Sequence, residues 1–222
     1  MLREERKAGV TDVCLSSHYY AAENSISTFI DRRQHMYSRL CEEMKDRHFK
    51  NPRLHLGAEV YYFKGIADEP LLDLLCCGDS NLILIEPPMQ KWDDELFREL
   101  RRLREERGLQ PVIAHLDRYV MMLDDPELFA KVRSSGFLIQ CNISFFLRED
   151  SSALACNLLR SGAVSFIGSD AHNMTNRAVK MDSFLRLIKK ERLEERLYTL
   201  SENGLRILQG KNASNSGRRS FL

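Results

Sequence analysis

Residues 164–172 read Val-Ser-Phe-Ile-Gly-Ser-Asp-Ala-His, an apolar run followed at once by two side chains that bind metals. The apolar part predicts a buried strand, and Asp170 and His172 stand two residues apart at its carboxyl end. In a protein built of repeating β/α units the active site forms at the carboxyl ends of the strands, because the βα loops gather there. Carboxylate and imidazole are common ligands of divalent metals. This stretch therefore favours a β/α fold with a metal site at one edge of its sheet.

Six short apolar runs alternate with helical segments along the chain. The predicted strands are residues 12–15, 54–60, 82–85, 111–114, 137–141 and 164–167. The predicted helices are residues 1–8, 26–44, 69–77, 93–107, 126–133, 153–160 and 178–200. Strands that are apolar on both faces, alternating with amphipathic helices, indicate a parallel sheet covered by helices. Gly108, Gly136 and Gly162 each follow a predicted helix, as helix-ending glycines do.

The composition is that of one globular domain. The chain has 222 residues, with Lys+Arg 33 against Asp+Glu 32 and a net charge of +1, so there is no strong electrostatic case for nucleic acid or an anionic membrane. No apolar run approaches the roughly 20 residues that span a bilayer. Residues 1–7 lack the apolar segment of a secretory signal, so no membrane insertion is expected. We expect one domain over residues 1–209 and a disordered polar tail over residues 210–222.

The six cysteines are expected to be reduced and structural. The sequence holds no Cys-x-x-Cys pair, and the adjacent Cys76 and Cys77 are poorly placed for a disulfide with each other. Cys14 and Cys141 fall in predicted strands, where a thiol packs as a small apolar group. Reduced thiols predict a cytoplasmic protein.

Four of the six predicted strands end in residues that bind metals. The set consists of His18, Glu59, His115 and the pair Asp170 and His172. One histidine near a strand end is usually structural, but four such ends at the same edge of a sheet indicate a shared site. The remaining histidines, His35, His48 and His55, are expected to be solvated or packed without a functional role.

Nitrogen and oxygen ligands without thiolate suit Mn, Fe or Zn better than a softer metal. Several of them can hold two or three ions, with a carboxylate such as Glu59 bridging, and such clusters activate water and clamp a phosphoryl group. Arg118 is expected in the loop three residues after His115. Its planar guanidinium matches phosphate oxygens, so we expect it to bind phosphate rather than form a surface salt bridge.

These residues carry a resemblance to a known family. The matching stretches are 57–63 (Gly-Ala-Glu-Val-Tyr-Tyr-Phe), 84–88 (Leu-Ile-Glu-Pro-Pro) with Trp92, 113–115 (Ile-Ala-His) with Arg118 and Tyr119, and 168–173 (Gly-Ser-Asp-Ala-His-Asn). They resemble the PHP (polymerase and histidinol phosphatase) superfamily, and within it the bacterial manganese-dependent tyrosine-protein phosphatases of capsule or exopolysaccharide biosynthesis. The resemblance implies a distorted (β/α)7 barrel and two to three Mn²⁺ ions, with Zn²⁺ or Fe²⁺ as alternatives.

The resemblance also assigns roles. It implies that His18, Glu59, His115, Asp170 and His172 are metal ligands and that Arg118 holds the phosphate. The implied partner is a phosphotyrosine protein, namely a bacterial tyrosine kinase, and the oligomeric state is left open.

One departure concerns the start of the chain. The family opens with a strand that ends in a His-x-His motif, and this sequence has no such motif. We therefore expect a barrel whose first strand is missing, in either a fragment or a naturally shortened protein. Two other functions stay open: a phosphoesterase for a small ester such as histidinol phosphate, and a weakly active remnant that binds a partner.

Overall fold

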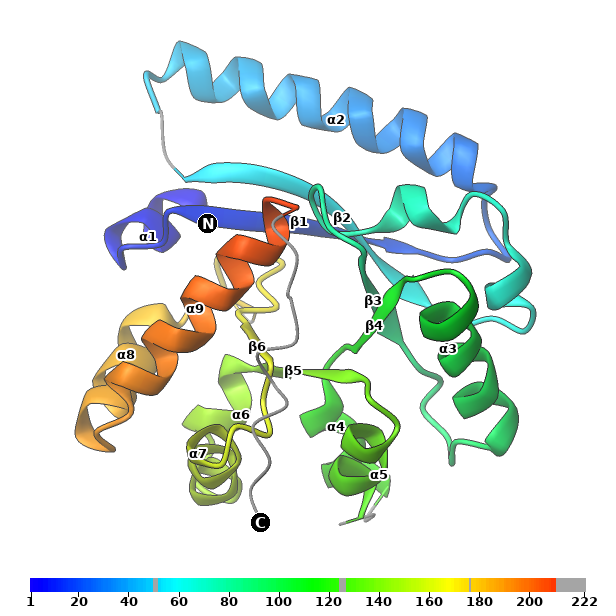
Figure 1. Ribbon diagram of the computed structural model, residues 1–222. Coiled ribbons are helices and arrows are strands. Elements are labelled where there is room, and N and C mark those ends of the chain that lie inside the picture. The colour runs from blue at the N-terminus through cyan, green and yellow to red at the C-terminus, as the bar shows by residue number, and fades with distance from the viewer. Residues whose placement is uncertain (50–51, 124–126, 176, 211–222) are drawn as a thin grey trace.

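The computed structural model describes residues 1–49, 52–123, 127–175 and 177–210. Six strands form one parallel sheet whose spatial order follows the sequence, β1-β2-β3-β4-β5-β6 (Figure 1). Their bounds are β1 Asp12–Tyr19, β2 Arg53–Tyr61, β3 Leu82–Glu86, β4 Gln110–Ile113, β5 Leu138–Asn142 and β6 Phe166–Gly168. The six predicted strands are thereby confirmed, and all their carboxyl ends point to one edge of the sheet.

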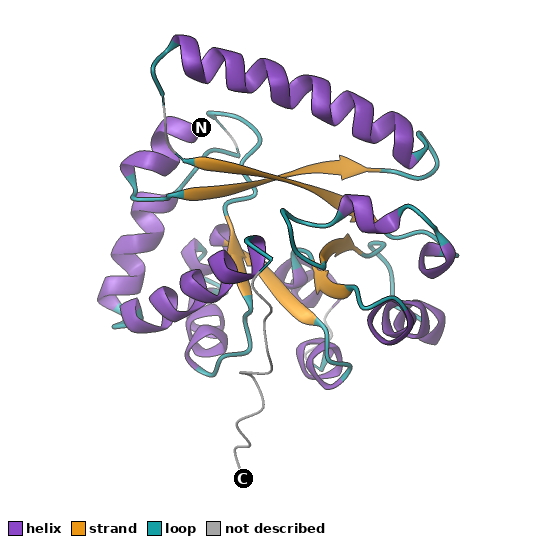
Figure 2. Cartoon of the chain, turned by 45° about the horizontal axis from the view of Figure 1, so that its top comes forward, coloured by secondary structure: helices purple, strands orange, loops and turns teal. Residues whose placement is uncertain are grey.

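The helices lie around the outside of the curved sheet (Figures 1 and 2). Their bounds are α1 Leu2–Lys7, α2 Ile26–Asp46, α3 Asp94–Glu106, α4 Leu116–Leu123, α5 Leu128–Ser134, α6 Ile143–Leu147, α7 Ser152–Arg160, α8 Met181–Lys190 and α9 Glu194–Leu208, and two short 3-10 turns span Ile66–Asp68 and Leu72–Leu75. None of the helices in the described ranges is long and apolar enough to cross a membrane.

Helix α3 shows how the sequence pattern produces the packing. The side chain of Asp93 caps its amino end by accepting a hydrogen bond from the backbone N–H of Leu96 at 2.9 Å. Leu100 and Leu103 on its apolar stripe are fully buried in the core between helix and sheet. The chain leaves the helix through Gly108, whose φ of 66° suits glycine, as expected.

Two predicted helices are wrong. Residues 69–77 form no α-helix: they contain only the 3-10 turn Leu72–Leu75, which ends where Cys76 adopts an extended backbone conformation. Residues 178–200 do not form one helix, because α8 ends in a turn where Arg192 has a φ of 55° before α9 begins. The short helices α4 and α6 were not predicted. Arg118 therefore lies on the first turn of α4, not in a loop.

The sheet is open between its two edge strands. Within the described residues β1 pairs only with β2, and β6 pairs only with β5. Figure 1 shows the curl of the sheet. It brings His18 on β1 into contact with His172, which follows β6. An open, strongly curled parallel barrel matches the expected architecture. The expected polar tail lies outside the described residues from position 211 onward.

Candidate metal centre

The predicted ligands of the first two strands face each other. His18 on β1 is the register partner of Glu59 on β2, and the His18 Nδ1 lies 3.4 Å from Glu59 Oε1. Glu59 is 4% exposed, whereas the His18 side chain is 35% exposed. Parallel pairing of two strands thus places an imidazole beside a buried carboxylate, as the strand-end argument requires.

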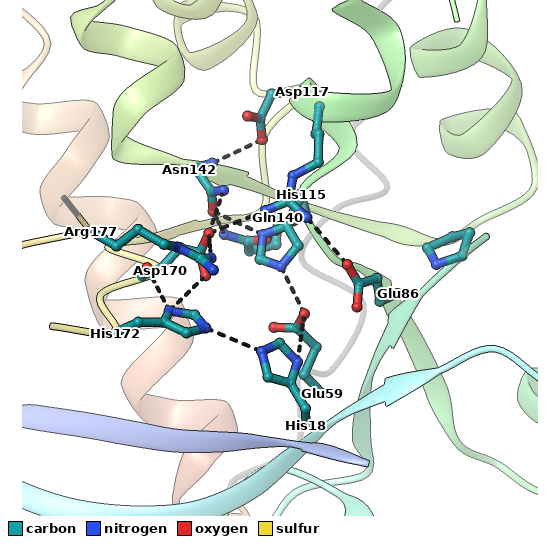
Figure 3. Close-up of polar contacts among 12 residues, drawn as sticks. His18, Glu59, Glu86, His115, Asp117, Gln140, Asn142, Asp170, His172 and Arg177 are labelled. Atoms are coloured by element: carbon teal, nitrogen blue, oxygen red, sulfur yellow. Dashed lines mark hydrogen bonds and ion pairs between the residues drawn. The ribbon is translucent and has the colours of Figure 1, made fainter. Parts of the chain in front are cut away.

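His115 is held on the other side of Glu59 by a buried polar network (Figure 3). Its Nε2 lies 2.9 Å from Glu59 Oε1, and its Nδ1 lies 3.0 Å from Asn142 Oδ1. The His115 backbone N–H donates to Gln140 Oε1 at 2.6 Å. These contacts hold a residue whose φ is 49°, a conformation uncommon outside glycine that surrounding structure must support.

Asp170 and His172 follow β6 and complete the ring of predicted ligands. His172 Nε2 lies 3.1 Å from His18 Nε2, which joins the ends of β6 and β1. Asp170 also has a φ of 49°. Its carboxylate accepts hydrogen bonds from Arg118 at 3.3 Å, from Asn142 at 3.2 Å and from Arg177. All five predicted ligands and Arg118 therefore meet in one site.

Glu86 belongs to the same site but was not among the predicted ligands. It is the last residue of β3, and its carboxylate accepts from Arg118 Nη1 at 3.2 Å. Ligand atoms of His18, Glu59 and Glu86 all lie within 4.8 Å of one another, so these three can share an ion. A signal was present in the sequence, since Glu86 directly follows a predicted strand as the other ligands do.

Four further polar residues support the ligands. Gln140 and Asn142 lie on β5 beneath His115, and Asp117 Oδ1 accepts from the Asn142 backbone N–H at 2.9 Å. Arg177 reaches Asp170 from the loop after β6. Neutral amides and a loop arginine carry no metal-ligand pattern, so the sequence could not single them out.

The electrostatics of the site favour an ionised carboxylate at its centre. Burial raises the pKa of Glu59, but hydrogen bonds with His115 and His18 outweigh burial and hold that pKa well below its usual range. The hydrogen bond that the Glu59 carboxylate accepts from His18 raises the pKa of His18. Burial, followed by the charge of Glu59, raises the pKa of Glu86. The repulsion between the carboxylates of Glu59 and Glu86 is one that a bound cation would relieve.

The donor spacing fits a metal. Neighbouring ligand atoms bonded to one ion at about 2.1 Å lie about 3 Å apart. The separations are 3.1 Å between His18 Nε2 and His172 Nε2, 2.9 Å between His115 Nε2 and Glu59 Oε1, and 3.4 Å between His18 Nδ1 and Glu59 Oε1. The first and third use different nitrogens of His18, so they fit two ions rather than one. The donors are imidazole nitrogens and carboxylate oxygens, a set that suits Mn, Fe or Zn.

The remaining histidines lie outside the site. His35 and His48 are exposed, and His55 Nε2 lies 2.9 Å from Asp12 Oδ1 at the opposite end of β1. All six cysteines are free thiols, as expected.

Fold and site together define the class of protein: an open parallel α/β barrel with a candidate histidine–carboxylate metal site at its strand ends. The chain belongs to the CpsB/CapC family, whose description is "Capsular polysaccharide synthesis, CpsB/CapC" and which matches residues 1–209. The resemblance to the capsule-type phosphatases is thereby confirmed at the level of the family.

Individual relatives are more distant. The chain is 28% identical over 144 residues to "Tyrosine-protein phosphatase YwqE" of Bacillus subtilis (strain 168), an alignment that covers 62% of this chain and only 55% of that protein. It is 24% identical over 226 residues to "Putative tyrosine-protein phosphatase CapC" of Staphylococcus aureus, covering 96% of this chain and 84% of that one.

A solved structure shares the fold. The similarity has a TM-score of 0.78 at 21% identity and covers 96% of this chain and 86% of the other. That structure is described as "Crystal structures of YwqE from Bacillus subtilis and CpsB from Streptococcus pneumoniae, unique metal-dependent tyrosine phosphatases". The expected fold class is therefore confirmed.

Proposed function

We propose that this chain is a metal-dependent protein-tyrosine phosphatase that hydrolyses phosphotyrosine on a bacterial tyrosine kinase of capsule or exopolysaccharide synthesis. The observation that carries the proposal is the convergence of imidazoles, carboxylates and the Arg118 guanidinium at one edge of the sheet. The names of the family members support the choice of phosphotyrosine as substrate.

The metal ligands in this proposal are His18, Glu59, His115, Asp170 and His172, with Glu86 added from the structure. Mn²⁺ is the proposed ion, in two to three copies, and Zn²⁺ or Fe²⁺ fit the same donors. Bound ions would polarise the phosphate oxygens and lower the pKa of water.

Arg118 is the proposed phosphate-binding residue. Its guanidinium lies between two carboxylates, with Nη1 3.2 Å from Glu86 Oε1 and Nη2 3.3 Å from Asp170 Oδ2. These two contacts fix the plane of the guanidinium at the rim of the site. In that place Arg118 would orient the phosphate and offset negative charge that develops during hydrolysis.

Aromatic rings beside His18 offer a surface for the tyrosine ring of the substrate. The Tyr20 ring lies 6.0 Å from the His18 ring and 5.6 Å from the Tyr61 ring, measured between centroids. A cavity of about 530 Å³ lies mainly between β1 and α2, and its lining also includes His18 and Tyr20. An apolar wall next to a phosphate site suits an aryl phosphate better than a small aliphatic ester.

The proposal places the protein in the cytoplasm, where its kinase partner would present phosphotyrosine. Free thiols throughout the chain are consistent with that compartment.

The experiment compares phosphate release from a phosphotyrosine peptide and from histidinol phosphate, with the purified chain carrying measured amounts of Mn²⁺. We expect faster release from the peptide, at least one bound ion per chain, and loss of activity after chelation. Arg118→Lys keeps the positive charge but loses the planar guanidinium with its paired N–H donors. We therefore expect kcat to fall about tenfold or more, with the metal content unchanged.

Faster turnover of histidinol phosphate would replace the substrate in this proposal. Less than one ion per chain together with no release from either compound would instead indicate a partner-binding remnant.

A further inference from the structure

The cavity at the centre of the barrel does not end at the metal ligands. It has a volume of about 320 Å³, and its lining includes Glu59, His115 and Asp170 together with Cys14 and Cys77. Two thiols therefore lie in the same open space as the candidate metal centre, although the mechanism proposed above uses neither of them.

Gly57 allows the two thiols to meet. Cys14 lies on β1 and Cys77 lies between η2 (Leu72–Leu75) and β3, on opposite sides of β2. A Cβ atom placed on Gly57 would lie 3.0 Å from Cys14 Sγ and 3.1 Å from Cys77 Sγ. Both sulfurs thus occupy the space that a side chain at position 57 would fill, and they interact with each other there.

The two thiols differ in their surroundings. Cys14 is half-buried, whereas Cys77 is 8% exposed in a small apolar cluster with Leu82 and Val112. The neighbouring Cys77 thiol lowers the pKa of Cys14, burial opposes this, and the charge of Arg33 adds to the lowering. The contact with Cys14, followed by burial, raises the pKa of Cys77. Cys14 is thus the more accessible and more nucleophilic of the two.

Arg33 supplies an independent observation. It reaches from α2 and donates from Nη1 to the backbone carbonyl of Gly57 at 2.9 Å, the residue against which both sulfurs pack. Its Nε is buried and, among the described residues, has no hydrogen-bond partner. A guanidinium held here with an unused donor is a local positive charge that a thiolate on Cys14 would partly neutralise.

We propose that Cys14 and Cys77 form a peroxide-sensitive dithiol that closes to a disulfide beneath the metal centre. The Cys14 thiolate attacks one oxygen of hydrogen peroxide, the O–O bond breaks, and the leaving hydroxide takes a proton to become water. The Cys77 sulfur then attacks the sulfenic sulfur of Cys14, the S–O bond breaks, and hydroxide leaves with the Cys77 proton as a second water. Two thiols are oxidised and one peroxide is reduced.

The disulfide would tie β1 to the segment that leads into β3, across β2. Backbone hydrogen bonds already fix that segment, since Cys77 N–H donates to Leu82 O at 2.9 Å and Gly78 N–H donates to Leu56 O at 2.7 Å. Cys14 shares a face of β1 with His18, because side chains on a strand alternate with a period of two. The cross-link would therefore form on the face that carries a metal ligand.

The test treats the full chain with hydrogen peroxide, blocks the remaining thiols, and maps peptides without reduction. We expect loss of two of the six thiols, a linked pair of peptides that carry Cys14 and Cys77, and recovery of both thiols with dithiothreitol. Cys76→Ala is the matched control, since Cys76 is equally buried but packs into the main core, and burial raises its pKa to about 12. This variant should still form the link, which assigns it to Cys77.

Cys14→Ala and Cys77→Ala should each abolish the link. Six alkylatable thiols after treatment of the wild-type chain, or a link that persists in either of these two variants, would overturn the proposal. If Cys77→Ala does not fold, the wild-type chain and Cys14→Ala still decide the result. The readout is a covalent bond, so it stands apart from the outcome of any phosphatase assay.

Discussion

The two sides of the candidate metal centre are built differently. On the closed side, between β2 and β5, His115 is 3% exposed and is held by three polar contacts to Glu59, Gln140 and Asn142. On the open side, between β1 and β6, the side chains of His18 and His172 are 35% and 37% exposed. There the two imidazoles mainly contact each other and the nearest carboxylates.

This difference in burial indicates that the protein holds the side chains of the closed side in place before any ion binds. Closed-side ligands belong to the packed interior, so changing one of them disturbs both the fold and metal binding. Open-side ligands stand at the rim of edge strands, so they can be changed with little effect on the fold. Substitutions on the two sides should therefore separate stability from metal binding.

The largest effect is expected from His115→Asn. Asparagine tolerates the positive φ of this position, so the variant removes the imidazole without adding backbone strain. Glu59 loses its nearest partner inside the protein, and we expect the free energy of unfolding to fall by about 2 kcal/mol. Phosphate release should fall about 100-fold. Urea unfolding, Mn²⁺ titration and peptide turnover measure the three quantities, and an unchanged unfolding midpoint would contradict the closed-side description.

A smaller and more selective effect is expected from His172→Asn. The side chain is partly exposed, so the free energy of unfolding should change by no more than about 0.5 kcal/mol. Loss of this proposed ligand should nevertheless raise the Mn²⁺ dissociation constant about tenfold. The same titration and unfolding experiments apply. A loss of stability as large as that of His115→Asn would remove the distinction between the two sides.

The smallest effect is expected where hydrogen bonds hold the start of β1, the edge strand of the open side. At the start of β1, Asp12 accepts hydrogen bonds from Arg53 at 3.0 Å and pairs with His55 at 2.9 Å. Burial raises the pKa of Asp12, but these hydrogen bonds outweigh burial and lower it overall. A lowered folded-state pKa means that the stabilisation is complete above the ordinary carboxyl pKa and is lost as the pH falls through the folded-state value.

We therefore expect Asp12→Asn to lower the free energy of unfolding by about 1 kcal/mol at neutral pH. The difference from the wild type should shrink as the pH falls toward about 2. Urea unfolding across this pH range is the measurement. A difference that stays constant with pH would show that the carboxylate charge does not stabilise β1.

The sequence predicts those residues of the site that follow a repeated pattern along the chain. Strand after strand ends in a metal-binding residue, so His18, Glu59, His115 and Asp170 could be placed at one sheet edge before the structure was known. Glu86 fits the same rule, but in the sequence the stretch 84–88 that contains it carries only the resemblance to the family.

Other features could not be predicted because they depend on tertiary contacts. Gln140 and Asn142 matter only because β5 lies beneath His115. His115 and Asp170 both have a positive φ. A glycine in the sequence would have suggested such a conformation, but a histidine or an aspartate does not. The neighbourhood of Cys14 and Cys77 depends on the missing side chain of Gly57, which belongs to the strand between them.

The contact between His18 and His172 joins residues that are 154 positions apart in the chain. Each strand pairs with the next one in the sequence, so the sheet can be assembled one β/α unit at a time with short loop closures. This contact is different, because it can form only after the last strand has docked. Metal uptake that requires both imidazoles would then report the final step of folding, and its rate would follow the slowest closure of the chain.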